Sequence, residues 1–269
     1  IIMEYSPSEA SAKLGKGLRE KPLVLVGKGV TFDSGGLNLK PGEHMADMHL
    51  DMSGGAAVIY SMYLIAKLKL PINVVGLVPT VENMPSGFSY RQGDIVKAYG
   101  GKTIEIGNTD AEGRVILSDA IEYAKTKKPA LIFTLATLTG ACMVALGTRM
   151  SGLFVKDNKG LRDLLEQIGA DSGDIVWPLP LTEDSEKDAE SSFADVINTN
   201  KAGIRYGGAS TGAGFLSHFA KGVPFAHIDM SHMTTLPDEE FLSRGASGFG
   251  VRYFIELARR WNDIKNLLK

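Results

Sequence analysis

Short apolar runs rich in valine, isoleucine and leucine alternate along the chain with segments whose apolar residues recur at helical spacing. The runs have the length and composition of buried β-strands, which are predicted at residues 23–26, 72–81, 131–138 and 225–230. The segments with helical period predict helices at residues 56–68, 112–125, 161–168 and 251–268. This alternation is typical of βαβ units, so we expect the α/β class, with a mainly parallel central sheet flanked by helices.

The longest uncharged run, residues 130–147, has the length of a membrane-spanning helix but not its content, because threonines and Gly140 interrupt it. It is predicted instead as a buried strand, a turn and the start of another element, and no membrane partner is expected. Glycine-rich stretches at residues 27–42 and 203–214 are predicted as loops. Residues 1–5 are predicted to end a strand that begins upstream.

The amino-acid composition and net charge of the chain limit the kinds of protein and binding site that it can form. With 29 Lys and Arg against 31 Asp and Glu, the net charge is −2, which gives no broad basic face for general nucleic-acid binding. The 269 residues, 44% hydrophobic and 22% charged, suit one globular domain. A single cysteine, Cys142, excludes an internal disulfide and a cysteine-based zinc site, and it fits a reducing compartment.

Charged residues gather where predicted strands end, which is where open α/β sheets bind ligands. Lys28, Asp33 and Lys40 follow the strand at 23–26, and Asp51 precedes the small residues that start the helix at 56–68. The third place is the segment Asn108-Thr109-Asp110-Ala111-Glu112-Gly113-Arg114, at another helix start.

Each acidic residue also has a purely structural explanation. Thr109 and Glu112 have the spacing of a capping box, Asp51 and Asp110 suit helix N-termini, and Asp33 suits a turn. Taken together, however, four carboxylates at one sheet edge would repel one another unless cations compensated them. Two divalent ions bound by shared oxygen ligands would supply that compensation, as in two-metal hydrolases.

Two other kinds of site receive less support. The Gly27-Lys28-Gly29 and Gly100-Gly101-Lys102-Thr103 motifs each lack a glycine that nucleotide binding requires. The Gly208-Ala209-Ser210-Thr211-Gly212 motif has a nucleophile-elbow pattern, with Asp229 and His232 following in the order of an α/β-hydrolase. Because no strand is predicted before Ser210, a serine hydrolase is the weaker alternative.

The motif from Asn108 to Arg114 resembles, without a departure, the signature of the leucyl aminopeptidases, the two-metal cytosolic aminopeptidases. Nearly the whole chain resembles the catalytic domain of that family, in separate blocks that keep their order. One local departure is Met230-Ser231-His232, where many members carry smaller residues. The other matching blocks are residues 27–36, Lys40, Asp51-Met52, Glu82-Asn83-Met84, Tyr90-Arg91, residues 136–141 and residues 226–229.

The resemblance implies two divalent ions per subunit, zinc or manganese, with magnesium or cobalt possible. Asp33, Asp110 and Glu112 would form an exchangeable site. Lys28, Asp33, Asp51 and Glu112 would form a tighter one, so that Asp33 and Glu112 bridge the two ions. An amine such as Lys28 binds a metal only after losing its proton, which a neighbouring dication favours.

The resemblance also implies the reaction and its substrates, which are peptides with a free N-terminus. A hydroxide that bridges the metals would attack the first peptide bond, Lys40 would stabilise the oxyanion, and Arg114 would hold a bicarbonate that acts as the base. Met48, Thr137 and Gly140 would line the pocket for a leucine-like first side chain. His227, on a predicted strand, is expected to be a hydrogen-bonded structural residue rather than a ligand.

The family further implies a homohexamer of paired trimers in the cytoplasm. Residues 1–269 would be the catalytic domain, with 1–21 connecting it to an N-terminal domain outside this sequence. Some bacterial relatives also act as DNA-binding accessory proteins, which is the competing class of function. The near-neutral charge does not favour it here, and salt-dependent DNA binding would distinguish the two classes.

Overall fold

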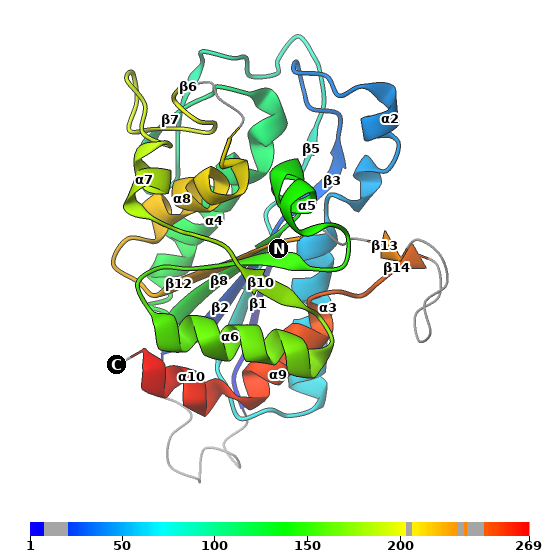
Figure 1. Cartoon of the computed structure of the whole chain (residues 1–269), viewed down its shortest axis with the longest axis vertical. Helices are drawn as coiled ribbons and strands as arrows, with labels where there is room; N and C mark the ends of the chain where they lie inside the picture. The colour runs from blue at the N-terminus through cyan, green and yellow to red at the C-terminus, as the bar shows by residue number, and fades with distance from the viewer. Residues whose placement is uncertain (8–20, 203–205, 231–233, 236–244, 269) are drawn as a thin grey trace.

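A seven-stranded sheet runs through the middle of the molecule (Figure 1) in a computed structural model that describes residues 1–7, 21–202, 206–230, 234–235 and 245–268. Four neighbouring strands are parallel, while β1 is antiparallel to β4, and β9 is antiparallel to β12. The mainly parallel sheet predicted from the sequence is therefore confirmed. In spatial order the strands are β1 (Ile2–Tyr5), β4 (Val74–Leu77), β2 (Leu23–Gly27), β8 (Leu131–Ala136), β12 (Phe225–Asp229), β9 (Ser151–Val155) and β10 (Val176–Pro178).

Helices cover both faces of this sheet, as Figure 1 shows. Leu23 and Leu25 of β2 pack into one core with α3 (Ser53–Lys67), α6 (Lys159–Ser172), α9 (Val251–Arg259) and α10 (Trp261–Leu267). Val24 and Val26 face the opposite core, with α4 (Glu112–Thr126), α5 (Gly140–Leu146) and α8 (Gly208–Ala220). Because neighbouring residues of a strand point to opposite faces, the fully apolar β2 requires these two helical layers.

Smaller elements surround the carboxyl ends of the parallel strands. β3 pairs in parallel with β5, and a second small sheet has the order β11-β7-β6. These elements and the remaining short ones are β3 (Gly29–Asp33), β5 (Thr80–Asn83), β6 (Ile95–Lys97), β7 (Thr103–Glu105), β11 (Val196–Ile197), β13 (Thr234–Thr235), β14 (Gly245–Ala246), α2 (Gly42–Met45), η2 (Met48–Leu50), η3 (Thr109–Ala111) and α7 (Glu183–Lys187).

The two glycine-rich stretches are only partly the loops that were predicted: residues 34–41 form a loop, and residues 203–205 lie outside the described residues. The first contains β3, and the second ends inside α8. A Cβ on Gly214 would lie 2.3 Å from the carbonyl oxygen of Ser185, so this glycine allows α8 to approach α7 closely. Tertiary packing therefore overrides the weak helix propensity of glycine in α8.

Other predicted elements differ mainly at their ends. The strand predicted at 72–81 divides into β4 and β5, and the helix predicted at 251–268 divides at Arg260 into α9 and α10. The run at 130–147 contains β8 and α5, as expected for a strand, a turn and another element. Residues 2–5 do form a strand, at the edge of the main sheet. Within the described ranges, no helix is long and apolar enough to cross a membrane.

Candidate metal centre

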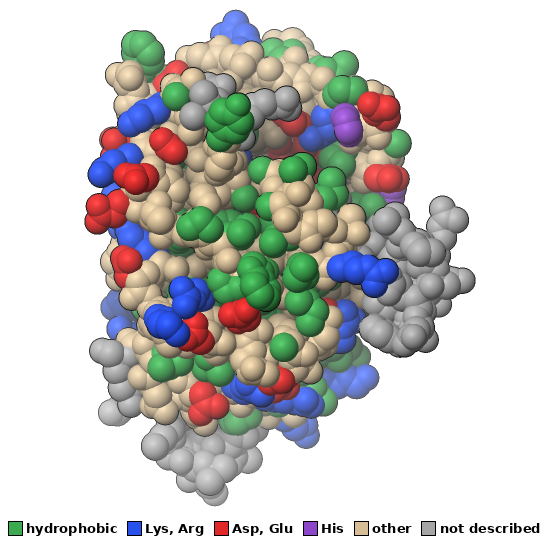
Figure 2. Space-filling model, in the orientation of Figure 1, with side chains coloured by type: hydrophobic (Ala, Val, Ile, Leu, Met, Phe, Trp, Pro, Cys, Tyr) green, Lys and Arg blue, Asp and Glu red, His purple; other side chains and the backbone are tan. Residues whose placement is uncertain are grey.

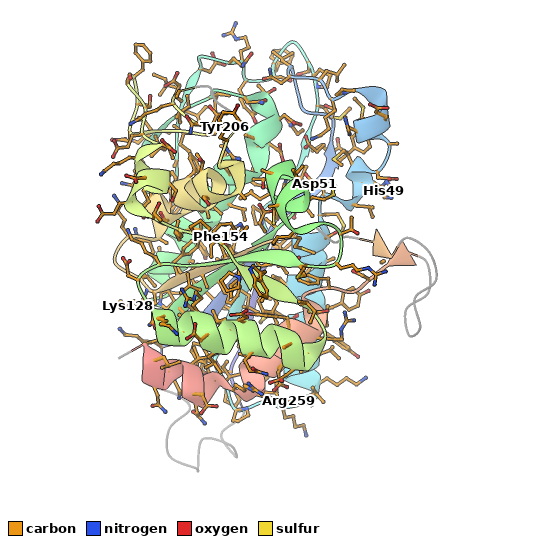
Figure 3. All side chains as sticks on the ribbon, in the orientation of Figure 1. His49, Asp51, Lys128, Phe154, Tyr206 and Arg259 are labelled. Atoms are coloured by element: carbon orange, nitrogen blue, oxygen red, sulfur yellow. The ribbon has the colours of Figure 1, made fainter. Side chains whose placement is uncertain are left out.

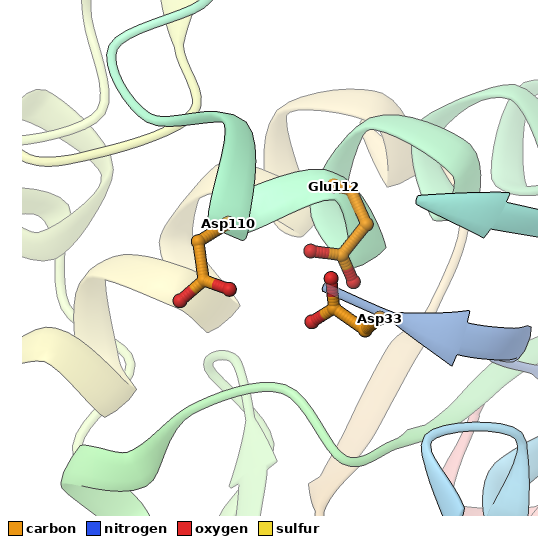
Figure 4. Close-up of side chains that lie close together, drawn as sticks. All are labelled: Asp33, Asp110 and Glu112. Atoms are coloured by element: carbon orange, nitrogen blue, oxygen red, sulfur yellow. The ribbon is translucent and has the colours of Figure 1, made fainter. Parts of the chain in front are cut away.

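Three carboxylates from two separate parts of the chain meet beyond the end of β2. Asp33 is the last residue of β3, Asp110 lies in η3, and Glu112 begins α4. Figure 4 shows the three side chains turned toward a common space. One oxygen of each lies within 4.8 Å of the others, and Asp33 and Glu112 are only 2% and 3% exposed. The convergence of carboxylates predicted from the strand ends is therefore present for these three residues.

Two lysines connect these carboxylates and bring in the fourth, Asp51. Lys28 Nζ lies 2.8 Å from Asp51 Oδ2 and 2.7 Å from Glu112 Oε1, and it donates to the carbonyl oxygen of Thr137 at 3.0 Å. Lys40 Nζ lies 2.9 Å from Asp33 Oδ2 and 2.5 Å from Asp110 Oδ1. The five proposed metal ligands and Lys40 thus form two ion-paired groups, one around Lys28 and one around Lys40, and the nearby carboxylates of Asp33 and Glu112 bring the two groups side by side.

Burial and neighbouring charges have opposing effects on the pKa of each of Glu112 and Lys28. Burial raises the pKa of Glu112 to about 7, although the Lys28 ammonium opposes the shift. Burial alone would lower the pKa of Lys28, but Glu112 and Asp51 outweigh it and raise the pKa above its ordinary value. Lys28 would therefore bind a dication only by exchanging its proton for that ion.

The donor set fits divalent metal ions. Glu112 Oε2 is buried, and in the described part of the chain it has no hydrogen-bond partner. An unpaired buried carboxylate oxygen is costly, and a cation bound beside it would remove that cost. Oxygen ligands from three carboxylates suit Mn²⁺, Mg²⁺ or Zn²⁺, and the Lys28 nitrogen adds a donor that Zn²⁺ accepts.

Asp51 reaches the cluster because α3 begins directly against the sheet. A Cβ on Gly27 would lie 2.3 Å from the carbonyl oxygen of Gly54, so only glycines permit this approach. Gly55 N donates to the Lys28 carbonyl oxygen at 2.7 Å, and Thr137 Oγ1 donates to Asp51 Oδ1 at 2.6 Å. Figure 3 shows Asp51 at the upper end of α3, where these contacts hold it.

The turn that carries Asp110 is held by side-chain contacts rather than by the capping box that Thr109 and Glu112 could have formed. Thr109 Oγ1 donates to the Gly35 carbonyl oxygen at 2.6 Å, while the Glu112 side chain pairs with Lys28. Asn83 Nδ2 donates to Asp33 Oδ1 at 2.8 Å and to the Thr109 carbonyl oxygen at 2.9 Å. The capping-box explanation is therefore wrong, and Asn83 ties the two acidic segments together.

A cavity of about 570 Å³ opens beside the cluster. Figure 2 shows a hollow in the upper half of this face, with acidic and basic side chains inside it. Met48, Thr137 and Gly140, the three residues expected to bind substrate, all line the cavity, and so does Lys40. Further apolar lining comes from Met230, which begins the segment that departs from the family pattern, and from Leu39, Leu138 and Met143, which sequence reasoning did not single out as a pocket.

Arg114 lies in the first turn of α4, two residues after Glu112. Its Nη1 donates to the carbonyl oxygen of Asn198, and its Nε is buried with no hydrogen-bond partner in the ranges described. Burial lowers the pKa of Arg114, although Asp229 opposes the shift. A Cβ on Gly212 of α8 would lie 3.4 Å from Arg114 Nη2 and 3.2 Å from the Thr139 side chain, so this glycine lets α8 pack closely against the guanidinium.

Asp229 holds the segment after β8 that forms one wall of the cavity. The sequence did not indicate this role. This fully buried carboxylate accepts from Leu138 N at 3.0 Å, Thr139 N at 3.1 Å and Thr139 Oγ1 at 2.6 Å. Burial raises its pKa to about 6. Nearby, Thr134 Oγ1 and His227 Nδ1 lie 2.8 Å apart, so His227 is the hydrogen-bonded structural residue expected.

The structure does not support the serine alternative. Ser210 is the third residue of α8, and in the described segments before that helix the preceding strand is β11, which ends at Ile197. The sharp turn from strand to helix that exposes a nucleophilic serine is therefore not formed at Ser210. The Asp229 carboxylate already accepts hydrogen bonds from Leu138 N and Thr139 Oγ1. His232 lies outside the described residues.

Comparison with known proteins identifies close relatives over almost the whole chain. The model of the cytosol aminopeptidase family, catalytic domain, matches residues 1–255. A probable cytosol aminopeptidase of Chlorobium limicola is 45% identical over 263 residues, which cover 97% of this chain and 50% of the relative. One of Aromatoleum aromaticum is 48% identical over 256 residues, covering 95% and 48%. The chain thus spans about half the length of the curated relatives it matches.

Proposed function

The chain belongs to the cytosol aminopeptidase family, and we propose that it removes the N-terminal residue from peptides in a metal-dependent reaction. The observation that carries the proposal is the convergence of Asp33, Asp110 and Glu112, which pair with Lys28 and Lys40, beside a cavity of about 570 Å³. The relatives' names support the same activity.

In this proposal the carboxylates hold two divalent ions, zinc or manganese. Asp33, Asp110 and Glu112 hold the exchangeable ion, and Lys28, Asp33, Asp51 and Glu112 hold the tighter one. When bound, such ions polarise a carbonyl group and lower the pKa of water. The buried Glu112 Oε2, which lacks a hydrogen-bond partner among the described residues, supports its role as a shared ligand.

Lys40 is placed to act on the scissile carbonyl group. Lys40 lines the cavity, its ammonium lies between Asp33 and Asp110, and its side chain is 16% exposed, so it can donate to an oxygen of a bound peptide. The charge on that oxygen grows as the carbonyl carbon becomes tetrahedral, and the hydrogen bond from Lys40 strengthens with it.

Arg114 would hold a bicarbonate that carries the proton to the leaving amine. The buried Nε of Arg114, which has no hydrogen-bond partner in the described ranges, supports an anion there. Met48, Thr137 and Gly140 would receive the first side chain, and the apolar part of the lining, from Leu39, Leu138, Met143 and Met230, favours leucine-like residues.

The proposal extends to the whole protein. We propose a homohexamer of paired trimers, with residues 1–21 leading from an N-terminal domain into this catalytic domain. A cytoplasmic location agrees with the word cytosol in the names of the relatives. Peptides, rather than nucleic acids or membranes, are the proposed partners, in agreement with the net charge of −2.

The requirement for a free α-amine tests the proposed reaction. Leucine amide should be hydrolysed, while N-acetyl-leucine amide should react at least about 100-fold more slowly, because acetylation removes the amine that positions the substrate. Release of ammonia measures both rates. Equal rates for the two amides, or hydrolysis within a blocked peptide, would show that the chain is not an aminopeptidase.

A further inference from the structure

Asn198 lies beside the segment that carries Asp110 and Glu112, although it is far from that segment in the sequence. It follows β11, which pairs in parallel with β7 so that Val196 is opposite Ile104. Asn198 N continues the pairing by donating to the Glu105 carbonyl oxygen at 3.1 Å. The strand register therefore delivers the side chain of Asn198, which is fully buried, to the segment just before Asp110.

The amide of Asn198 makes four hydrogen bonds there, all to the main chain. Oδ1 accepts from Gly107 N at 2.8 Å and from Asn108 N at 3.2 Å. Nδ2 donates to the Asn108 carbonyl oxygen at 2.8 Å and to the Ala111 carbonyl oxygen at 3.3 Å. An amide offers two donors and accepts through two lone pairs, so all of its hydrogen-bonding capacity is used.

These contacts lie on both sides of Asp110. Asn108 is the N-cap of η3, and its Oδ1 accepts from Asp110 N at 2.8 Å. Ala111 directly precedes Glu112. The Asn198 carbonyl oxygen also accepts from Arg114 Nη1. One residue thus fixes the turn that carries two carboxylates and the guanidinium that follows them.

The opposite side of the metal centre is held by different residues. Asp51 accepts from Thr137 Oγ1, and the Lys28 main chain is bound by Gly55 N. Lys28 directly follows β2, Thr137 directly follows β8 and Gly55 lies in α3, so neither contact involves the segment held by Asn198. A disturbance at Asn198 should consequently affect the Asp110 side of the centre more than the Asp51 side.

We infer that Asn198 is a positioning residue for metal binding, which sets the affinity of the ion held by Asp33, Asp110 and Glu112. The inference rests on the proposed function, because it assumes that these carboxylates bind metal. Groups that orient metal ligands through hydrogen bonds commonly change affinity by about 10- to 100-fold when removed. The four main-chain bonds of Asn198 give it this kind of influence over Asp110.

Titration of the metal-free chain with Mn²⁺ by calorimetry tests the inference without using activity. In Asn198→Ala the Kd of the weaker site should rise by about 10- to 100-fold, while that of the tighter site should change by less than about threefold. Asn200→Ala is the matched control, since Asn200 is a buried asparagine of the same segment whose Oδ1 accepts from Ala202 N. Both of its Kd values should stay within about threefold of wild type.

Asn198→Ser provides a second variant if the alanine variant does not fold, because its hydroxyl can keep part of the contacts. The Kd of its weaker site should lie between the Kd of the wild type and that of Asn198→Ala. Unchanged affinities in a folded variant would overturn the inference, and so would equal weakening of both sites together with a lower Tm. A wild-type chain that binds no Mn²⁺ would instead contradict the proposed function itself.

Discussion

Glu112→Ala should lose bound metal and should lower kcat/KM by more than about 10³-fold, the largest effect expected of any single substitution here. Glu112 is a proposed ligand of both ions, so its removal affects two sites at once. It would also leave the Lys28 ammonium with only Asp51 and the Thr137 carbonyl oxygen as partners among the described residues, because Lys28 Nζ now lies 2.7 Å from Glu112 Oε1. Metal content by mass spectrometry and hydrolysis of leucine amide measure the two losses.

Glu122→Ala is the matched control for this substitution. Glu122 lies on the same helix, α4, and pairs with Lys125 rather than with the metal centre. Its variant should keep its metals and an activity within about threefold of wild type. If Glu112→Ala kept both ions and full activity, Glu112 would be only a structural partner of Lys28.

Lys40→Ala should lower kcat by about 10² to 10³-fold while the chain keeps its metals. The ammonium is proposed to meet an oxyanion that exists only as the carbonyl becomes tetrahedral, so its loss affects the transition state more than the bound substrate. Metal binding should survive or tighten, because Lys40 pairs with Asp33 and Asp110 and competes with cations for them. Steady-state kinetics and metal content, measured on the same preparation, separate these effects.

Lys156→Ala is the control for removing a paired lysine. Lys156 pairs with Glu186, away from the metal ligands, so its kcat should stay close to that of wild type. A Lys40→Ala variant that released metal would make Lys40 a structural residue. A variant with a higher KM and an unchanged kcat would make it a residue that binds the ground state only.

Local patterns were sufficient to predict the core of the fold and the position of the acidic cluster. β2 and β8 are short and wholly apolar, which is what a strand covered on both faces requires. Asp33 and Asp51 could be placed beyond β2 because parallel strands end at the same edge of a sheet. The family resemblance, rather than a local pattern, gave Asp33 and Asp51 their roles as metal ligands. Those roles remain part of the proposal.

The remaining features depend on contacts between distant residues. The glycines of α8 gave a loop-like pattern, and only the close approach of α7 shows why they suit a helix. β11 has two residues, too few to form a pattern, yet its pairing with β7 brings Asn198 to Asn108, which is 90 residues earlier. Asp229 likewise gave no sign that it would accept hydrogen bonds from Leu138 and Thr139, because a single acidic residue at a strand end suits several roles.

The central claim is that the carboxylates of this cluster hold the ions on which catalysis depends. The most direct measurement is hydrolysis of leucine amide by the metal-stripped chain during titration with Mn²⁺, with bound metal measured at each step. The account predicts no activity without metal and full activity as about two ions bind per chain. Full activity in chain shown to be free of metal would contradict it.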